Sequence, residues 1–250
     1  MKISILQTGS DGNATVVEAG GSTLIFDAGI SYRRLVQLYG CAPQAEALFI
    51  SHSHTDHIRH AERIHKLAKH VHLTEPTRLR GASFLNGIPV VPIADAETVE
   101  YPGCKVTAFP TQHDAAGSVG FVVEETDTGK SFSMITDTGM LTDKIKHATR
   151  GSHAYFFESD YDEQGLIDYP HYPMHLKNRI KGNYGHLSTQ TVIGHIKEHI
   201  DLDSVEWIVF GHLSKKTNSK ALLQSHLNKA FREHELSKFH ISSEPLFLKL

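Results

Sequence analysis

Residues 52–57 read HSHTDH, a segment that offers four strong metal ligands within six positions. Imidazole nitrogens and carboxylate oxygens both bind divalent ions, and two imidazoles two positions apart can share one ion. The carboxylate and the last imidazole lie further around the segment and are better placed for a second ion. The four ligands are His52, His54, Asp56 and His57. A polar surface turn in a chain with 19 histidines is the plain alternative, but the density of ligands favours a metal site.

Three more candidate ligands lie far along the chain, and each follows an apolar run typical of a strand and precedes a polar turn. They are His113, Asp137 and His212. Strand ends at one edge of a sheet can bring such residues together, and ligands from elsewhere are needed to complete both sites. Asp137 is the only carboxylate of the three, and its two oxygens allow it to bridge two cations. These residues therefore predict a site for two divalent ions.

The tetrapeptide GHLS occurs twice, at 185–188 and at 211–214. The second GHLS directly follows the apolar run 205–210, so a strand supports His212 and we assign it as the metal ligand. His186 instead follows a loop that contains glycine and asparagine, and Ser188 is a suitable N-cap for the helix expected next. A loop histidine beside a metal site is better placed to contact substrate. An exposed histidine in a tetrapeptide repeated by chance is the alternative.

The elements that must position these residues alternate along the chain. Runs rich in β-branched residues at 2–8, 14–18 and 22–27 are separated by glycine-containing turns and predict a meander. The apolar run 47–50 leads directly into HSHTDH, and a helical pattern follows over 58–68. We therefore expect the ligands at a strand-to-helix turn.

Further along, we expect one strand over 99–109, one helix over 218–234 and one strand over 240–248. Each half of the chain places its functional residues at strand ends. This order suggests an α/β protein in which two sheets pack together with helices outside.

Length and composition limit the possibilities further. A chain of 250 residues is compatible with a single domain spanning 1–250. Its net charge of −3 means that any nucleic-acid binding must come from a local basic patch. Cys41 and Cys104 lie far apart and suggest neither a disulfide framework nor a thiolate zinc site. No apolar run approaches the ~20 residues of a membrane helix and no leader pattern begins the chain, so we expect a soluble cytoplasmic protein without a membrane partner. The oligomeric state stays open.

The motif HxHxDH, followed along the chain by His113, Asp137 and His212, resembles the ligand pattern of the metallo-β-lactamase fold superfamily. The resemblance extends over nearly the whole chain. Other segments resemble its bacterial YycJ/WalJ-like branch: GSDGN at 9–13, QHDAAGSVGF at 112–121, SFSMITDTG at 131–139, YPMHLKNRIKGNYGHLS at 172–188 and VFGHLSKKTN at 209–218. That branch implies a four-layer αββα sandwich of two mixed β-sheets with outer helices. It also implies a dinuclear metal site and a nuclease-type phosphodiesterase activity on DNA.

Carried over by position, the resemblance implies one ion on His52, His54 and His113, another on Asp56, His57 and His212, and Asp137 as the bridge between them. Asp56 is also a candidate catalytic carboxylate. We expect Asp27 and Asp114 to orient ligand imidazoles, although an aspartate two positions before Gly29 is equally typical of a turn.

Glu158 and His186 resemble a pair in ribonuclease Z relatives, where a glutamate and a loop histidine assist phosphodiester cleavage. We expect His186 to donate a proton to the leaving oxygen or to bind the scissile phosphate, with Glu158 orienting it.

Two divalent ions about 3.5–4 Å apart lower the pKa of a water between them, so we expect water as the nucleophile. The fold and metals alone do not choose between β-lactam, lactone, thioester and phosphodiester. Cations near both GHLS copies favour a phosphate-binding surface, with a solvated basic loop as the alternative. These cations are Lys177, Arg179, Lys181, Lys215, Lys216 and Lys220, of which Lys177, Arg179, Lys215 and Lys216 are the expected substrate contacts.

We therefore expect a DNA exonuclease of the 5′-to-3′ type that uses two zinc or manganese ions. A small-molecule cyclic phosphodiesterase or a lactone hydrolase of the same fold is the alternative.

Overall fold

The computed structural model describes residues 1–242 and 245–250, and these residues form two compact units. The first unit contains residues 1–110, 115–131 and 245–250, and the second contains residues 111–114 and 132–242. The HSHTDH segment belongs to the first unit, whereas His113, Asp137 and His212 belong to the second.

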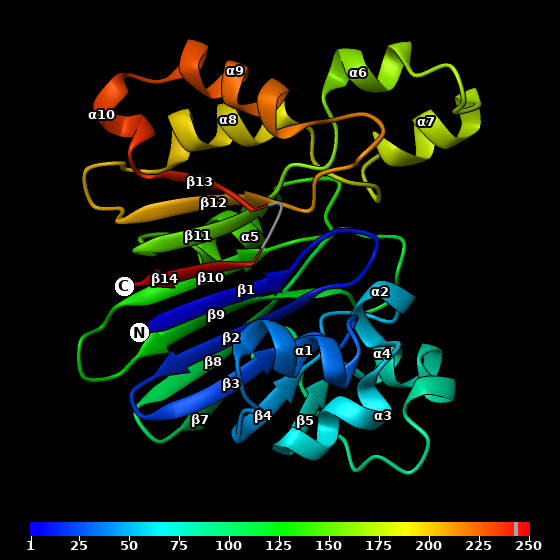
Figure 1. The fold of residues 1–250 in the computed structure, drawn as a ribbon, viewed down its shortest axis with the longest axis vertical. Helices are drawn as coiled ribbons and strands as arrows, with labels where there is room; N and C mark the ends of the chain where they lie inside the picture. The colour runs from blue at the N-terminus through cyan, green and yellow to red at the C-terminus, as the bar shows by residue number, and fades with distance from the viewer. Residues whose placement is uncertain (243–244) are drawn as a thin grey trace. The chain divides into compact units, whose positions relative to one another are not determined.

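A seven-stranded mixed sheet with the order β14-β1-β2-β3-β4-β5-β6 forms the base of the first unit (Figure 1). Its strands are β1 (Lys2–Gln7), β2 (Ala14–Ala19), β3 (Ser22–Phe26), β4 (Ala45–Phe49), β5 (Ala68–Leu73), β6 (Val91–Pro92) and β14 (Leu246–Lys249). Strands β14, β1, β2 and β3 pair antiparallel, as the predicted meander requires, and β3 to β6 pair parallel.

Short helices connect the strands of this unit, and a second group of strands pairs antiparallel within it. The helices are α1 (Tyr32–Tyr39), α2 (Thr55–Ile58), α3 (Ala61–Ile64), η1 (His65–Leu67), α4 (Glu75–Arg80) and η2 (Ala82–Phe84). The antiparallel group consists of β7 (Thr98–Tyr101), β8 (Cys104–Pro110) and β9 (Val119–Glu125).

Side chains cover both faces of the sheet at β3, where successive residues point to opposite faces. Ile25 of β3 packs in an apolar cluster with Leu35 of α1 and Ile64 of α3. Its neighbour Phe26 points to the other face, where its ring centroid lies 5.3 Å from that of Phe121 in β9. Helices therefore cover one face of this sheet and β9 packs on the other.

Two predicted elements of the first unit are wrong. The single strand expected over 99–109 is two strands, β7 and β8, joined by a turn at Pro102 and Gly103. Gly103 has a φ of 72°, and a Cβ there would lie 2.1 Å from the carbonyl oxygen of Gly20. The helix expected over 58–68 breaks into α3 and η1, and β5 begins at Ala68 because it pairs in parallel with β4.

Four parallel strands in the order β13-β12-β11-β10 form the base of the second unit. They are β10 (Ser131–Ile135), β11 (Ala154–Glu158), β12 (Trp207–Gly211) and β13 (Phe239–Ile241). Every residue of β10, β11 and β12 is buried. Continuous burial is typical of parallel strands that are covered on both faces.

The helices of the second unit are α5 (Asp143–Ala148), α6 (Glu163–Asp168), α7 (Met174–Ile180), α8 (Thr189–His199), α9 (Lys220–Ala230) and α10 (Glu233–Leu236). Figure 1 shows α8 and α9 side by side next to β12 and β13, and the two helices are in contact. The predicted N-cap of α8 is confirmed, because the Ser188 side chain accepts a hydrogen bond from the N–H of Thr191.

Two predictions for the second half of the chain are also wrong. The helix expected over 218–234 ends at Ala230, because Phe231 is extended and packs on Phe239 with ring centroids 4.8 Å apart. The single strand expected over 240–248 is two elements, the end of β13 and most of β14. β13 pairs with β12, whereas β14 pairs with β1. Residues 243–244 of the expected strand lie outside the described residues. Among the described residues, no helix is both long and apolar enough to cross a membrane.

Candidate functional site

The HSHTDH segment forms the turn between β4 and α2, as predicted. His52 and His57 are buried, whereas His54 and Asp56 are partly exposed. The ring centroid of His52 lies 4.1 Å from that of His57 and 4.8 Å from that of His54. The turn is closed by the His57 N–H, which donates to the carbonyl oxygen of His54 over 2.9 Å. Three imidazoles and one carboxylate are thus gathered by a single turn.

Asp27 follows β3 and determines how His57 is oriented. Its Oδ2 lies 2.7 Å from Nδ1 of His57, and its Oδ1 accepts hydrogen bonds from the N–H and the hydroxyl of Ser51 over 2.8 and 2.9 Å. Because a carboxylate only accepts hydrogen bonds, this contact places the His57 proton on Nδ1 and the lone pair on Nε2. Metal-binding histidines are commonly oriented in this way by a carboxylate.

Asn13 also belongs to the site, although no role was predicted for it from the sequence. Its Nδ2 lies 2.9 Å from Nε2 of His57 and 3.3 Å from Oδ2 of Asp56, so the amide contacts two of the candidate ligand atoms. The N–H of Gly9 donates to Oδ1 of Asn13 over 2.8 Å and fixes the amide. The available signal was the GSDGN segment at 9–13, which carried part of the family resemblance.

In the second unit, Asp137 lies at the centre of a group of histidines. Its Oδ1 is 3.5 Å from Nε2 of His212, 3.7 Å from Nδ1 of His186 and 3.9 Å from Nε2 of His113. These separations are longer than charged hydrogen bonds and suit atoms that share a cation. The ligand atoms of Asp137, Glu158, His186 and His212 all lie within 4.8 Å of one another. The donor set therefore fits a divalent metal ion.

Asp27, Asp137 and His212 share an uncommon backbone conformation, with φ values of 63°, 53° and 51°. Each follows the end of a strand by one or two residues. A left-handed conformation of this kind costs a non-glycine residue of order 1–3 kcal/mol and is found most often at functional sites. The shared conformation supports a functional role for all three strand ends.

His113 is oriented by the backbone of the loop before α8. Its Nδ1 lies 3.0 Å from the carbonyl oxygen of Gly185, which can only accept, so Nε2 carries the lone pair and is the atom near Asp137. Burial lowers the pKa of His113 and favours the neutral form that a metal requires. Asp114 is held by Arg179, whose Nε and Nη2 lie 2.7 and 2.5 Å from Oδ2. Oδ1 of Asp114 is 3.6 Å from Nε2 of His113.

Glu158 and His186 form the hydrogen-bonded pair that the sequence predicted. Glu158 is fully buried at the end of β11, where Oε1 accepts the N–H of Thr138 over 2.7 Å and Oε2 lies 2.8 Å from Nδ1 of His186. Burial alone would lower the pKa of His186, but the carboxylates of Glu158, Asp160 and Asp137 together outweigh it and raise the pKa to about 10. The His186 side chain is 22% exposed, compared with 5% for His212. The first GHLS copy therefore holds the more accessible histidine.

Residues 158–160 connect the two GHLS copies. The N–H of Asp160 donates to the carbonyl oxygen of Leu187 over 3.0 Å, and the carbonyl oxygen of Asp160 accepts the N–H of Ser214 over 2.8 Å. Asp160 also reaches the cluster, with Oδ1 3.8 Å from Nδ1 of His212, and burial raises the pKa of Asp160. Asp160 was not predicted from the sequence, although its position two residues after β11 was a possible signal.

The predicted substrate contacts differ in their surroundings. Nζ of Lys177 donates to the carbonyl oxygen of Ile167 over 2.5 Å and links α7 to the end of α6. Arg179 is paired with Asp114, as described above. Lys215 and Lys216 are exposed in the segment that follows His212. Lys177 and Arg179 thus have partners within the second unit.

Comparison with known proteins decides the family. Residues 22–197 match the family described as the β-lactamase superfamily domain. The metallo-β-lactamase fold protein YhfI from Bacillus subtilis superposes with a TM-score of 0.73 at 13% identity, covering 99% of this chain and 98% of that one. The chain belongs to the metallo-β-lactamase superfamily. Its predicted fold class, two mixed β-sheets with helices, is confirmed.

Two curated members of this superfamily are similar in sequence over most of the chain. Exodeoxyribonuclease YycJ of Bacillus anthracis is 26% identical over 243 residues, covering 93% of this chain and 90% of that protein. Exodeoxyribonuclease WalJ of Streptococcus pneumoniae serotype 2 is 26% identical over 231 residues, covering 88% and 84%. The predicted resemblance to the YycJ/WalJ-like branch is confirmed, and membership of this superfamily makes the chain a metal-dependent hydrolase.

Proposed function

We propose that this hydrolase is a dinuclear phosphodiesterase that degrades DNA as a 5′-to-3′ exonuclease. The observation that carries the proposal is the position of Asp137, whose Oδ1 lies within 3.9 Å of nitrogens from three histidines. The similarity to two proteins named exodeoxyribonucleases supports DNA as the substrate. In this proposal the protein acts in the cytoplasm, with DNA and no membrane as its partner.

The predicted ligands would hold two zinc or manganese ions. One ion would be bound by His52, His54 and His113, the other by Asp56, His57 and His212, and Asp137 would bind both. The contacts of Asp137 with both His113 and His212 support its role as the bridge. The family match spans residues of both units, which supports a single domain over 1–250.

Two divalent ions supply a nucleophile from water near neutral pH and neutralise the charge of a phosphodiester. The chain itself provides proton transfer. With Nδ1 held by Glu158, the Nε2–H of His186 is free to donate a proton to the leaving oxygen or a hydrogen bond to the phosphate. Asp56 is the carboxylate that would accept a proton from the attacking water.

The basic residues near the two GHLS copies would bind the DNA backbone. Lys215 and Lys216 are exposed and would contact phosphates directly. Lys177 donates to the neutral carbonyl group of Ile167 and would add positive potential near the phosphates. Arg179 is neutralised by Asp114 and would instead hold α7, which precedes the loop that carries His186.

The test uses the full chain loaded with Mn²⁺ or Zn²⁺ and duplex DNA that carries a 5′-phosphate and a label at either end. We expect progressive shortening from the 5′ end, which is absent with Asp137→Ala and after chelation. No shortening of DNA by a fully metallated protein would overturn the proposal. The same preparation would then be assayed with small cyclic phosphodiesters and lactones.

A further inference from the structure

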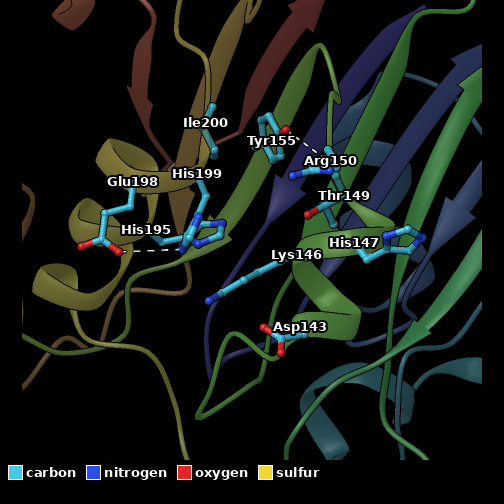
Figure 2. A pocket seen from close by; sticks show the side chains of 10 residues that line it. All are labelled: Asp143, Lys146, His147, Thr149, Arg150, Tyr155, His195, Glu198, His199 and Ile200. Atoms are coloured by element: carbon cyan, nitrogen blue, oxygen red, sulfur yellow. Dashed lines mark hydrogen bonds and ion pairs between the residues drawn. The ribbon is translucent and has the colours of Figure 1, made fainter.

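The second unit contains a cavity of about 490 Å³ to which the proposed function gives no role. It is lined by α5, by α8 and by Tyr155 near the start of β11, whereas Glu158 of the metal cluster lies at the end of that strand. Figure 2 shows the side chains that line it. Those used below are Lys146, His147, His195, Glu198 and His199.

Two histidines of α8 lie on the same side of the helix and face this cavity. His195 and His199 are four positions apart, a spacing that brings side chains together on a helix, and their ring centroids are 5.0 Å apart (Figure 2). Residues 195–199 read HIKEH, so the pair has the H-x-x-E-H spacing with which helices bind zinc. Oε2 of Glu198 lies 3.8 Å from Nε2 of His199.

The buried member of the pair has an unused donor atom. His195 is only 7% exposed, and among the described residues nothing forms a hydrogen bond with its Nδ1. A buried polar atom without a partner is costly, and a ligand in the cavity would relieve that cost. Basic residues in the last turn of a helix are also explained by the helix dipole. The dipole does not explain the spacing of the pair or the burial of His195.

We propose that His195 and His199 bind one divalent transition-metal ion in this cavity, with Glu198 as an additional oxygen ligand. Imidazole ligands favour Zn²⁺, Ni²⁺ or Cu²⁺ over Mg²⁺ and Ca²⁺. The site shares no residue with the proposed dinuclear centre, so it is independent of the nuclease proposal.

The first test counts ions. The full chain is saturated with Ni²⁺, freed of excess metal by gel filtration and analysed by elemental mass spectrometry. His199→Ala, at an exposed position, should hold one Ni²⁺ fewer per chain than the unaltered protein, and His195→Gln should lose the same ion. His147→Ala, which changes another histidine of the same cavity, should keep it. Equal Ni²⁺ content in the unaltered protein and both α8 variants would overturn the proposal.

The second test distinguishes a metal site from an anion site by whether one substitution raises or lowers the affinity for Ni²⁺. Lys146 lines the same cavity and repels a cation, so Lys146→Ala should tighten the binding of Ni²⁺ in a calorimetric titration. A pocket for phosphate would behave in the opposite way. If Lys146→Ala leaves Ni²⁺ binding unchanged or weaker and abolishes binding of inorganic phosphate, the cavity is an anion site and the proposal is wrong.

Discussion

At the residue scale, hydrogen bonds determine which ring nitrogen of a histidine is left for a metal ion. His57 and His113 each have Nδ1 bonded to an oxygen, from Asp27 and Gly185, and therefore present Nε2. His186 has its Nδ1 bonded to Glu158. Nδ1 of His186 is also its nitrogen near Asp137, 3.7 Å from Oδ1, whereas His113 turns Nε2 toward that oxygen at 3.9 Å. This orientation separates His113, a proposed ligand, from His186, the histidine proposed to act on substrate.

Asp27→Asn should weaken metal binding by about 10-fold to 100-fold. Asparagine keeps one acceptor for Ser51 but turns an amide toward Nδ1 of His57, which removes the carboxylate that orients the ring. Metal affinity measured by competition with a chelating dye checks this. The exposed carboxylate of Asp203 provides the control, because Asp203→Asn should bind metal like the unaltered protein. Unchanged affinity in Asp27→Asn would contradict the role of Asp27.

His186→Asn should lower turnover of a phosphodiester by about 10²-fold to 10⁴-fold and leave the metal content intact. The expected loss follows from the removal of the donor that Glu158 holds in place. Steady-state kinetics and metal analysis of the same preparation measure both quantities. His171→Asn, an exposed change in the same segment, should keep full turnover. Loss of metal in His186→Asn would make His186 a ligand and not a proton donor.

At the element scale, the HSHTDH turn depends on close backbone approach. A Cβ on Gly29 would lie 1.6 Å from the carbonyl oxygen of Asp56, and that oxygen also accepts the N–H of Asn13 over 2.8 Å. Only glycine allows the segment after β3 to pass this close to α2. The position of Asp56 therefore depends on a residue that carries no functional group.

Gly29→Ala should destabilise the protein and reduce its metal content, because the backbone at Asp56 must move. Gly194→Ala is the matched control. Gly194 lies inside α8, where a Cβ would meet nothing within 4 Å, so this change should stabilise the protein by about 0.5–1 kcal/mol. Thermal unfolding and metal analysis of the two variants check the contrast. Equal stability of both variants would refute the close-packing argument.

Much of the site could be predicted because its ligands follow strands with strong apolar patterns. His113, Asp137 and His212 each stand just past a strand, where a polar residue is conspicuous. Asn13 and Asp160 were missed because their partners lie far along the chain. The internal partner of Lys177 could not be foreseen, since neither α6 nor α7 was expected in that loop.

The fold was predicted best where patterns are local. The meander β1 to β3 has β-branched runs and glycine turns that need no distant partner. Strand β5 was not predicted, and the expected helix over 58–68 ran into its first residue, because the pairing of β5 with β4 is a contact with a distant segment. The split of 99–109 was foreseeable, because Pro102 and Gly103 are a turn signal that was overlooked.

At the scale of the whole molecule, several buried or partly buried histidines make stability depend on pH. Burial lowers the pKa of four histidines outside the proposed dinuclear site: His60, His72, His195 and His240. A histidine whose folded pKa is lowered binds fewer protons when folded than when unfolded. Its stabilisation is present above the unfolded pKa of about 6.5 and is lost as the pH falls toward the folded value.

The metal-free protein should therefore lose stability as the pH falls from about 7 to about 5. His72 tests this directly, because it is 4% exposed, stacks on Phe49 and lies 2.6 Å from the Tyr101 hydroxyl through Nε2. His72→Phe removes the titrating group and should give a smaller loss over the same range. Urea midpoints at several pH values measure both slopes. Identical slopes in the two proteins would show that His72 does not titrate as described.

The most direct test of the central claim is anomalous diffraction from crystals of the zinc-loaded full chain, recorded above and below the zinc edge. The account predicts two neighbouring peaks that share Asp137, one on His52, His54 and His113 and the other on Asp56, His57 and His212. A single peak confined to Asp137, Glu158, His186 and His212, with no ion on the HSHTDH turn, would contradict it.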